Sequence, residues 1–164
     1  MTDAHNSIAT LGQLITLLQL EPRGVDQFQG ASEDIGTGRV FGGQVLGQAL
    51  VAACRTATSP IHSLHAYFLL PGDHHQPIDY LVERVRDGRS FATRRVVAQQ
   101  KGRTIFTMMA SFHAPEAGSF SHQRQMPAVP PPEGLQTETA LRQAQADQLP
   151  AGWRGEKLPP IEYR

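Results

Sequence analysis

Two consecutive glycines, Gly42 and Gly43, stand at the start of a segment with helical spacing and are followed by Gln44. The first turn of a helix carries backbone N–H groups without an intrahelical acceptor, together with a partial positive charge. Because neither glycine has a side chain, a carbonyl oxygen or a phosphate can approach these N–H groups closely. The residues therefore suggest an oxyanion or phosphate site. The alternative, which the spacing favours, is that the glycines only permit tight packing against a sheet.

Two carboxylates, Glu33 and Asp34, precede this helix in a polar, turn-rich stretch over residues 31–38. A carboxylate near a helix start can act as a general base and activate a water molecule. It can equally cap the helix or remain a solvated loop charge, and the sequence favours that interpretation. The pair is a candidate for hydrolytic chemistry that the residues alone do not establish.

Six arginines bracket two predicted hairpin turns, and guanidinium groups bind phosphates well. They are Arg84, Arg86, Arg89, Arg94, Arg95 and Arg103. Arginines on exposed strand faces also protect sheet edges from unwanted pairing, which is the interpretation that the sequence favours. Binding of the phosphates of an anionic ligand is the alternative hypothesis.

Metal and thiol chemistry have weaker support. His62 and His65 are expected on opposite faces of one strand, and His74 and His75 fall in a turn where they are expected to be solvated. Cys54 lies near a helix end, where the helix dipole disfavours a thiolate, so we expect a buried packing residue. No Cys/His cluster has zinc spacing, and the sequence has neither a Gly-x-Ser-x-Gly elbow nor a P-loop. We therefore predict no metal site and no cofactor.

The first elements that would position these residues are a helix and a strand. Apolar residues recur at helical spacing over residues 7–20, with Ser7 as the expected cap and residues 22–24 as the stop. Residues 25–30 are expected to form a short strand. The glycine-led helix is predicted over residues 43–56, and its small residues would let it lie very close to a sheet: Gly47, Ala49, Ala52 and Ala53.

Strand patterns follow this helix, separated by turn signals such as Asp87-Gly88 and Lys101-Gly102. The predicted strands cover residues 61–70, 78–86, 91–99 and 104–113. No second long helix interrupts them, so a parallel sheet is not expected. The sequence predicts an α+β fold in which an antiparallel meander of about four strands curls around one central helix.

Composition limits the function classes. The 164 residues suit one domain plus a tail, and the formal net charge of zero lacks the positive patch that nucleic acid requires. The single cysteine fits a reducing compartment, and no apolar run reaches the roughly 20 residues that span a bilayer. Without a recognisable signal peptide or sorting signal, we expect a soluble cytoplasmic protein with no membrane partner.

The C-terminal third differs in composition. Seven of the twelve prolines follow residue 126, and residues 126–132 read as an extended linker. A polar helix is predicted within residues 137–148, with Thr137 or Thr139 near its start. A linker connects two units, so we expect a partner domain to follow it.

Several segments, in order, resemble one enzyme family. They are Glu33-Asp34, VFGGQVLGQAL at residues 40–50, HSLHAYFLLPGD at 62–73, RDGRSFATRRV at 86–96, ASF at 110–112 and MP at 126–127. Over residues 8–135 the chain is similar to the acyl-CoA thioesterase II (TesB-type) family. The resemblance implies a hotdog fold, a long helix wrapped by an antiparallel sheet, with two such repeats in one chain. It also implies metal-free hydrolysis of fatty acyl-CoA to free fatty acid and CoA.

The resemblance divides the chain into an N-terminal hotdog domain (residues 1–116) and a Pro-rich linker with the start of a second repeat (residues 117–164). The family's catalytic Asp, Ser or Thr, and Gln lie in the second repeat, so no catalytic residue is assigned here. This half is expected to pair sheets and shape the acyl tunnel. The candidate substrate-binding residues are Gly42, Gly43, Gln44, Phe68, Arg89 and Arg94.

Two other functions stay open. The first is a non-catalytic hotdog that binds acyl-CoA or self-associates. The second is a single-hotdog thioesterase that works as a homodimer with Glu33 or Asp34 as its base. Because a lone repeat exposes a sheet edge, a homo-oligomer formed through sheet pairing is expected in either case.

Overall fold

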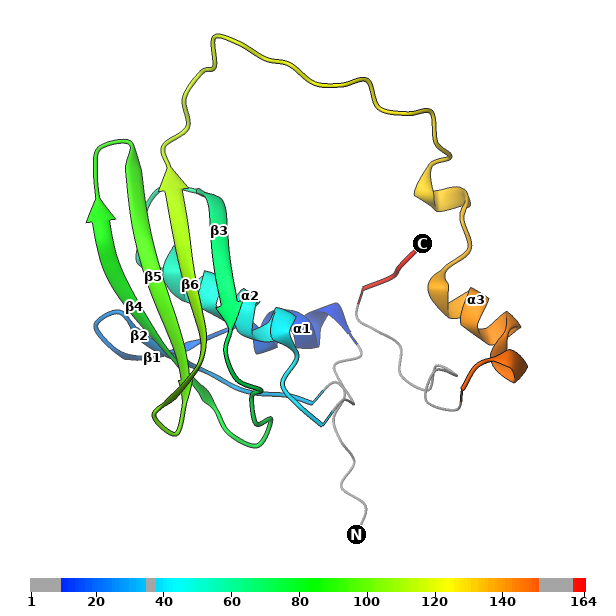
Figure 1. Cartoon of the computed structure of the whole chain (residues 1–164), viewed down its shortest axis with the longest axis horizontal. Helices are drawn as coiled ribbons and strands as arrows, with labels where there is room; N and C mark the ends of the chain where they lie inside the picture. The colour runs from blue at the N-terminus through cyan, green and yellow to red at the C-terminus, as the bar shows by residue number, and fades with distance from the viewer. Residues whose placement is uncertain (1–9, 35–37, 151–160) are drawn as a thin grey trace.

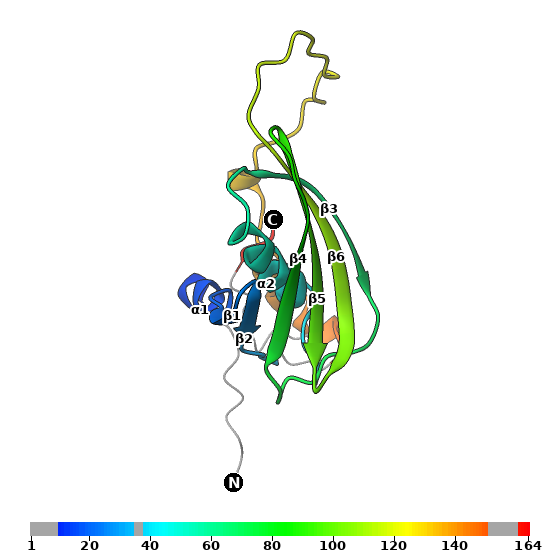
Figure 2. The same cartoon turned by 90° about the vertical axis from the view of Figure 1, so that its left-hand side faces the viewer.

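The computed structural model describes residues 10–34, 38–150 and 161–164 (Figure 1). It confirms the predicted α+β class, because one long helix packs against an antiparallel sheet. Figure 2 shows that the sheet is curved and that the helix lies against one of its faces. In the part of the chain that the structure describes, no helix is long and apolar enough to cross a membrane.

Among the described residues the sheet has six strands, in the order β1-β2-β4-β5-β6-β3. This is one strand more than the predicted meander of about four together with the short strand predicted over residues 25–30. Every neighbouring pair is antiparallel. The strands are β1 (Glu21–Gly24), β2 (Gln27–Gly30), β3 (Ile61–Phe68), β4 (Ile78–Asp87), β5 (Phe91–Gln100) and β6 (Arg103–His113). The last four agree with the predicted ranges to within two residues, since alternation and turn residues mark them locally.

The N-terminal region accounts for the extra strand, β1, whereas β2 lies within the strand predicted over residues 25–30. The prediction that residues 22–24 stop a helix was wrong, because they belong to β1, which pairs with β2 in a hairpin. Asp26 forms the turn with φ 55°, a conformation that Asp adopts more readily than most residues. Helix α1 (Leu11–Leu17) is shorter than predicted. Thr10 caps it through a reciprocal capping box with Gln13, whereas Ser7 lies outside the described residues.

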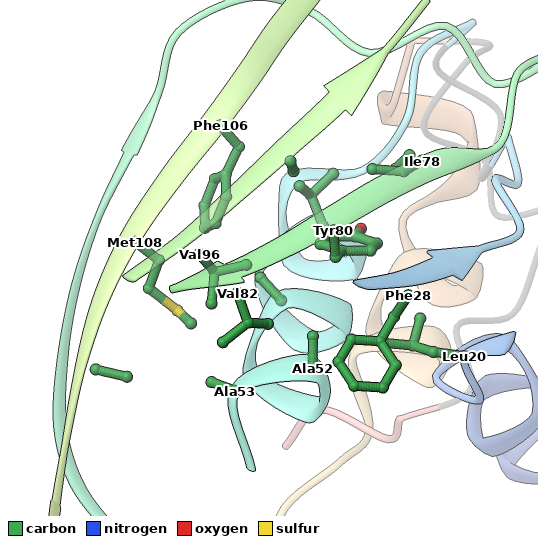
Figure 3. Packing of buried hydrophobic residues seen from close by; sticks show 14 of the residues in the cluster. Leu20, Phe28, Ala52, Ala53, Ile78, Tyr80, Val82, Val96, Phe106 and Met108 are labelled. Atoms are coloured by element: carbon green, nitrogen blue, oxygen red, sulfur yellow. The ribbon is translucent and has the colours of Figure 1, made fainter. Parts of the chain in front are cut away.

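Helix α2 (Gly42–Cys54) supplies the centre of the core. Ala49, Ala52 and Ala53 are fully buried, so the expected small face does press against the sheet. Figure 3 shows Ala52 and Ala53 facing side chains from β4, β5 and β6, among them Val82, Val96 and Met108. Burial of each large apolar side chain contributes about 1.5–3 kcal/mol. Small residues on the helix let the large ones on the sheet fill the space.

After β6 the chain leaves the sheet and runs along an extended path to α3 (Glu138–Ala144) (Figure 1). Two short 3₁₀ turns flank this helix, η1 (Pro132–Gly134) and η2 (Ala146–Gln148). Thr137, one of the two residues expected near the start of this helix, caps α3. Its side chain accepts a hydrogen bond from the Ala140 N–H at 3.1 Å. The domain boundary at residue 116 stays a prediction.

Candidate functional site

A cleft of about 410 Å³ lies at the N-terminal end of α2. Its walls come from three places: the segment that enters α2, the end of β3 with the loop after it, and the start of β6. The lining residues are Arg39, Val40, Gly42, Val45, Phe68, Leu69, Leu70, Pro71, Gly72, Ile105 and Phe106. Most of them are apolar, so the cleft can take a hydrocarbon group beside a helix start.

The two glycines bring aromatic rings onto the first turn of α2. A Cβ atom on Gly42 would lie 3.0 Å from Cε1 of Phe68, and one on Gly43 would collide with the ring of Phe41. Phe68 also packs edge-on against Phe106, with 5.0 Å between ring centroids. More than half of the Phe68 surface remains exposed. The glycines therefore permit a close approach of apolar groups to the helix start, as the tight-packing interpretation predicts.

The same turn retains hydrogen-bonding capacity. The N–H groups of Gln44 and Val45 donate to the Phe41 carbonyl oxygen at 3.0 and 3.3 Å. The N–H groups of Gly42 and Gly43 precede the first intrahelical bond, and Phe41 at the N-cap makes no side-chain cap. A carbonyl or oxyanion seated in the cleft would find two backbone donors and the positive end of the helix dipole.

Gln44, a third candidate binding residue, turns away from the cleft. Its side chain is 4% exposed, and its amide nitrogen donates to the Ala31 carbonyl oxygen at 2.9 Å. Its amide oxygen accepts from the Glu33 N–H at 3.4 Å. Gln44 thus holds the entry loop onto α2, and a binding role for it stays a prediction without support from this geometry.

Arg94 lies at the other end of α2, about 20 Å away at the 1.5 Å rise per residue of a helix. Arg94 is 1% exposed, and its Nε and Nη2 donate to the hydroxyl and carbonyl oxygens of Thr56, just beyond the helix, at 2.9 and 2.7 Å. Its other donors reach the carbonyl oxygens of Arg86 and Thr93 and the Asp87 carboxylate. The hydrogen-bond donors of the Arg94 guanidinium are therefore all used by groups of the chain itself. Arg89 is exposed at the β4–β5 turn, so the structure does not unite the six candidates in one site.

The acidic pair does not line the cleft either. Asp34 accepts a hydrogen bond from the Gly38 N–H at 3.0 Å and pairs with Val40 in an isolated bridge. Glu33 borders a separate hollow beside α1. This arrangement is what the loop-charge interpretation predicts.

Two smaller expectations were wrong. Cys54 is exposed rather than buried, although partial burial raises the pKa of its thiol and so disfavours the thiolate. His62 lies on the same face of the sheet as His65, not on the opposite face as predicted. A register shift between Ile61 and Ser63 turns its ring toward the outward-facing Ser111, whose hydroxyl oxygen lies 2.9 Å from His62 Nε2.

Part of the cleft lining was not predicted from the sequence. It consists of residues 69–72 and, earlier in the chain, Val40. Leu69 and Leu70 were assigned to a strand that in fact ends at Phe68. Instead, their N–H groups both donate to the Ile105 carbonyl oxygen, at 2.9 and 3.2 Å, which bends the chain around the mouth of the cleft. The Pro71-Gly72 pair was the local signal for this bend.

Comparison with known proteins gives consistent results. Residues 31–113, about half of the chain, match the profile of the family described as acyl-CoA thioesterase N-terminal domain. Acyl-CoA thioesterase 2 of Haemophilus influenzae is 47% identical over 142 residues, which cover 85% of this chain and 49% of that protein. Human acyl-coenzyme A thioesterase 8 is 47% identical over 122 residues, with 73% and 38% covered.

Solved structures agree with these relatives. The acyl-CoA thioesterase II TesB2 of Mycobacterium marinum is 48% identical with a TM-score of 0.65, over 73% of this chain and 45% of that one. A hot dog fold protein of unknown function from Alicyclobacillus acidocaldarius has a TM-score of 0.71 at 23% identity and shows the fold alone, over 87% and 52% of the two chains. The hotdog fold is thereby confirmed.

The chain spans about half the length of the curated relatives it matches, or less. The matched profile covers α2 and β3 to β6, which include every wall of the cleft. On this profile, and with the fold of the helix and sheet described above, the chain belongs to the acyl-CoA thioesterase N-terminal domain family.

Proposed function

We propose that this chain is the N-terminal hotdog half of an acyl-CoA thioesterase, with acyl-CoA as its ligand. The observation that carries the proposal is the apolar cleft at the uncapped start of α2. In this arrangement the acyl chain lies along Phe68, Ile105 and Phe106, and the thioester carbonyl oxygen points at the N–H groups of Gly42 and Gly43. The predicted linker and second-repeat segment, residues 117–164, and a cytoplasmic location remain part of this proposal.

Hydrolysis breaks the C–S bond of the thioester after water attacks its carbonyl carbon, and the products are a fatty acid and the CoA thiol. Within the described residues, no carboxylate lines the cleft, so nothing there is placed to take the proton of the attacking water. The resemblance assigns that role to a second repeat. We therefore expect this chain to bind acyl-CoA and to release no thiol by itself.

Binding is tested with a thioether analogue, S-dodecyl-CoA, which cannot be hydrolysed. Gly42→Val places a branched side chain against Phe68 and obstructs the helix start, so the dissociation constant measured by calorimetry should rise at least tenfold. Gly134→Ala is the matched control, because a Cβ atom there meets nothing within 4 Å. Unchanged affinity in a folded Gly42→Val variant would refute the cleft as the acyl site.

The homodimeric single-hotdog enzyme is separated from this proposal by thiol release from dodecanoyl-CoA and palmitoyl-CoA. Turnover by the chain alone that disappears in Asp34→Asn would establish that alternative. Absence of turnover together with analogue binding supports the scaffold role. Absence of both would leave only the self-associating hotdog.

We further propose that β3 pairs with a second hotdog, either another copy or a second repeat. This strand ends the sheet order, so among the described residues one side of its backbone has no partner strand. Tyr67, Phe68 and Leu69, at its end, are each more than half exposed. Unpaired edges that carry apolar side chains favour association. A monomeric mass by light scattering at micromolar concentration would contradict the homodimer.

A further inference from the structure

The loop between β3 and β4 brings together three side chains that bind metal ions in many proteins. Asp73, His74 and His75 each offer one ligand atom, and these atoms all lie within 4.8 Å of one another. The two imidazole rings lie 3.8 Å apart between centroids. Asp73 and His75 are exposed, so solvent reaches the cluster from their side, whereas both ring nitrogens of the half-buried His74 are shielded from solvent.

A buried side chain holds the backbone of this loop in place. Gln100 on β5 is 6% exposed, and its amide nitrogen donates to the carbonyl oxygens of Asp73 and Gln76, both at 2.8 Å. Its amide oxygen accepts from the Asp73 N–H at 2.8 Å. The His75 N–H adds a bond to Asp73 Oδ1 at 2.9 Å. The loop is thus fixed before any ligand arrives, which lowers the entropic cost of binding.

Two imidazoles and a carboxylate suit a divalent cation of zinc type, which accepts nitrogen and oxygen ligands. Neighbouring ligands on tetrahedral zinc lie about 3.4 Å apart, as follows from metal–ligand distances of about 2.1 Å. Side-chain rotations that move the ligand atoms by about an ångström bring them from the observed spacing to that of a zinc site. The exposed side chains of Asp73 and His75 can make such movements. Three ligands from consecutive residues leave one coordination position for water.

We propose that Asp73, His74 and His75 form a binding site for a zinc-type divalent cation. His74 already interacts within the chain, and cation binding competes with that interaction. The site lies next to the acyl cleft without forming part of its lining. Gly72, the preceding residue, lines the cleft and accepts a hydrogen bond from the Val40 N–H at 3.1 Å. A bound cation would therefore stiffen one rim of the cleft.

The test is calorimetric titration of the untagged chain with ZnCl₂ in a buffer that does not bind metals. We expect one ion per chain with a micromolar dissociation constant. Asp73→Asn and His75→Asn should each weaken binding at least tenfold. The matched control is the double variant His62→Asn with His65→Asn, which removes two exposed histidines from β3 and should leave the affinity unchanged.

NMR spectroscopy provides a second test of zinc binding that does not depend on calorimetry. NMR spectra of the imidazole groups should show zinc-dependent shifts at His74 and His75 and none at His62 or His65. The proposal is overturned if the chain binds no zinc at 100 µM, or if the control variant loses binding as much as His75→Asn does. Neither outcome depends on acyl-CoA, so the thioesterase proposal stands or falls separately.

Discussion

The hydroxyl group of Tyr80 on β4 donates a 2.7 Å hydrogen bond to Oε1 of Gln48 in the middle of α2, and both side chains are fully buried. The Gln48 amide nitrogen donates in turn to the carbonyl oxygens of Leu17 and Ala31, at 2.6 and 2.9 Å. One glutamine therefore joins the central helix to the sheet, to the end of α1 and to the entry loop. Its burial is tolerable only because every polar atom has a partner.

Replacement of Gln48 by leucine should destabilise the protein by about 2–4 kcal/mol, because it leaves the Tyr80 hydroxyl and the Leu17 carbonyl group buried without partners. Chemical denaturation measures this loss. Tyr80→Phe should cost about 1 kcal/mol by itself. The same Gln48→Leu change in the Tyr80→Phe background should cost less than in the wild type, and strict additivity would show that the two residues are not coupled.

Gly30→Ala should destabilise the protein by about 1–3 kcal/mol through overpacking. A Cβ atom on Gly30 would lie 2.7 Å from the Gln48 amide group, so this side chain has to move and give up part of its hydrogen bonding. The control Gly134→Ala meets nothing within 4 Å and should stay within about 0.5 kcal/mol of the wild type. Equal stability of the two variants would contradict the close approach of β2 and α2.

Arg94→Lys should lower stability by about 2–4 kcal/mol, because an ammonium group cannot reproduce the five directed bonds that the buried guanidinium makes. Thermal and urea unfolding report the loss. Arg89→Lys, at the exposed β4–β5 turn, should change stability by no more than about 0.5 kcal/mol. If Arg94→Lys is as stable as the wild type and instead weakens acyl-CoA binding, Arg94 belongs to the binding site after all.

Stability should fall in acid as Asp26 loses its charge. Two hydrogen bonds from Arg84, at 2.8 and 2.9 Å, hold the pKa of the Asp26 carboxyl below its usual value. A carboxyl whose pKa is lowered by folding contributes stability above its unfolded pKa of about 3.9 and loses it as pH falls through the folded value. Because both side chains are partly exposed, solvent screens the pair and its contribution is small.

Asp26→Asn tests this pair, because asparagine also tolerates the positive φ of the turn. The stability difference between wild type and variant should be largest above pH 5 and shrink below pH 4. A difference that is constant down to pH 2.5 would mean that the ion pair contributes nothing and that only the turn conformation matters.

The order of strands along the chain and the identity of the central helix were predictable from the sequence, whereas the first strand of the N-terminal hairpin, β1, was not. Strands β3 to β6 alternate or end at Gly and Pro, and these are local signals. In β1, Pro22 and Gly24 gave the opposite signal. That strand forms because β2, which is itself paired with β4, offers it an edge, and this is a tertiary effect.

Two of the six candidate binding residues lie at the cleft, and their binding role stays a prediction. Gly42 and Phe68 line the cleft, because a helix start and a strand end are both defined locally. Gln44 and Arg94 were chosen for chemistry that their residue types allow, but burial uses that chemistry inside the fold. Residue type shows which bonds a side chain can form, whereas only its neighbours in space show which bonds are left over.

What the sequence by itself determined is the sheet pattern, the small-faced helix and the family of the chain, since each depends on residue order. What only the tertiary structure decided is which polar groups face the cleft and which hold the core, which strand ends the sheet, and how His62 turns in β3. These outcomes depend on contacts between segments that are distant in the chain, because packing and hydrogen-bond satisfaction are properties of the whole fold.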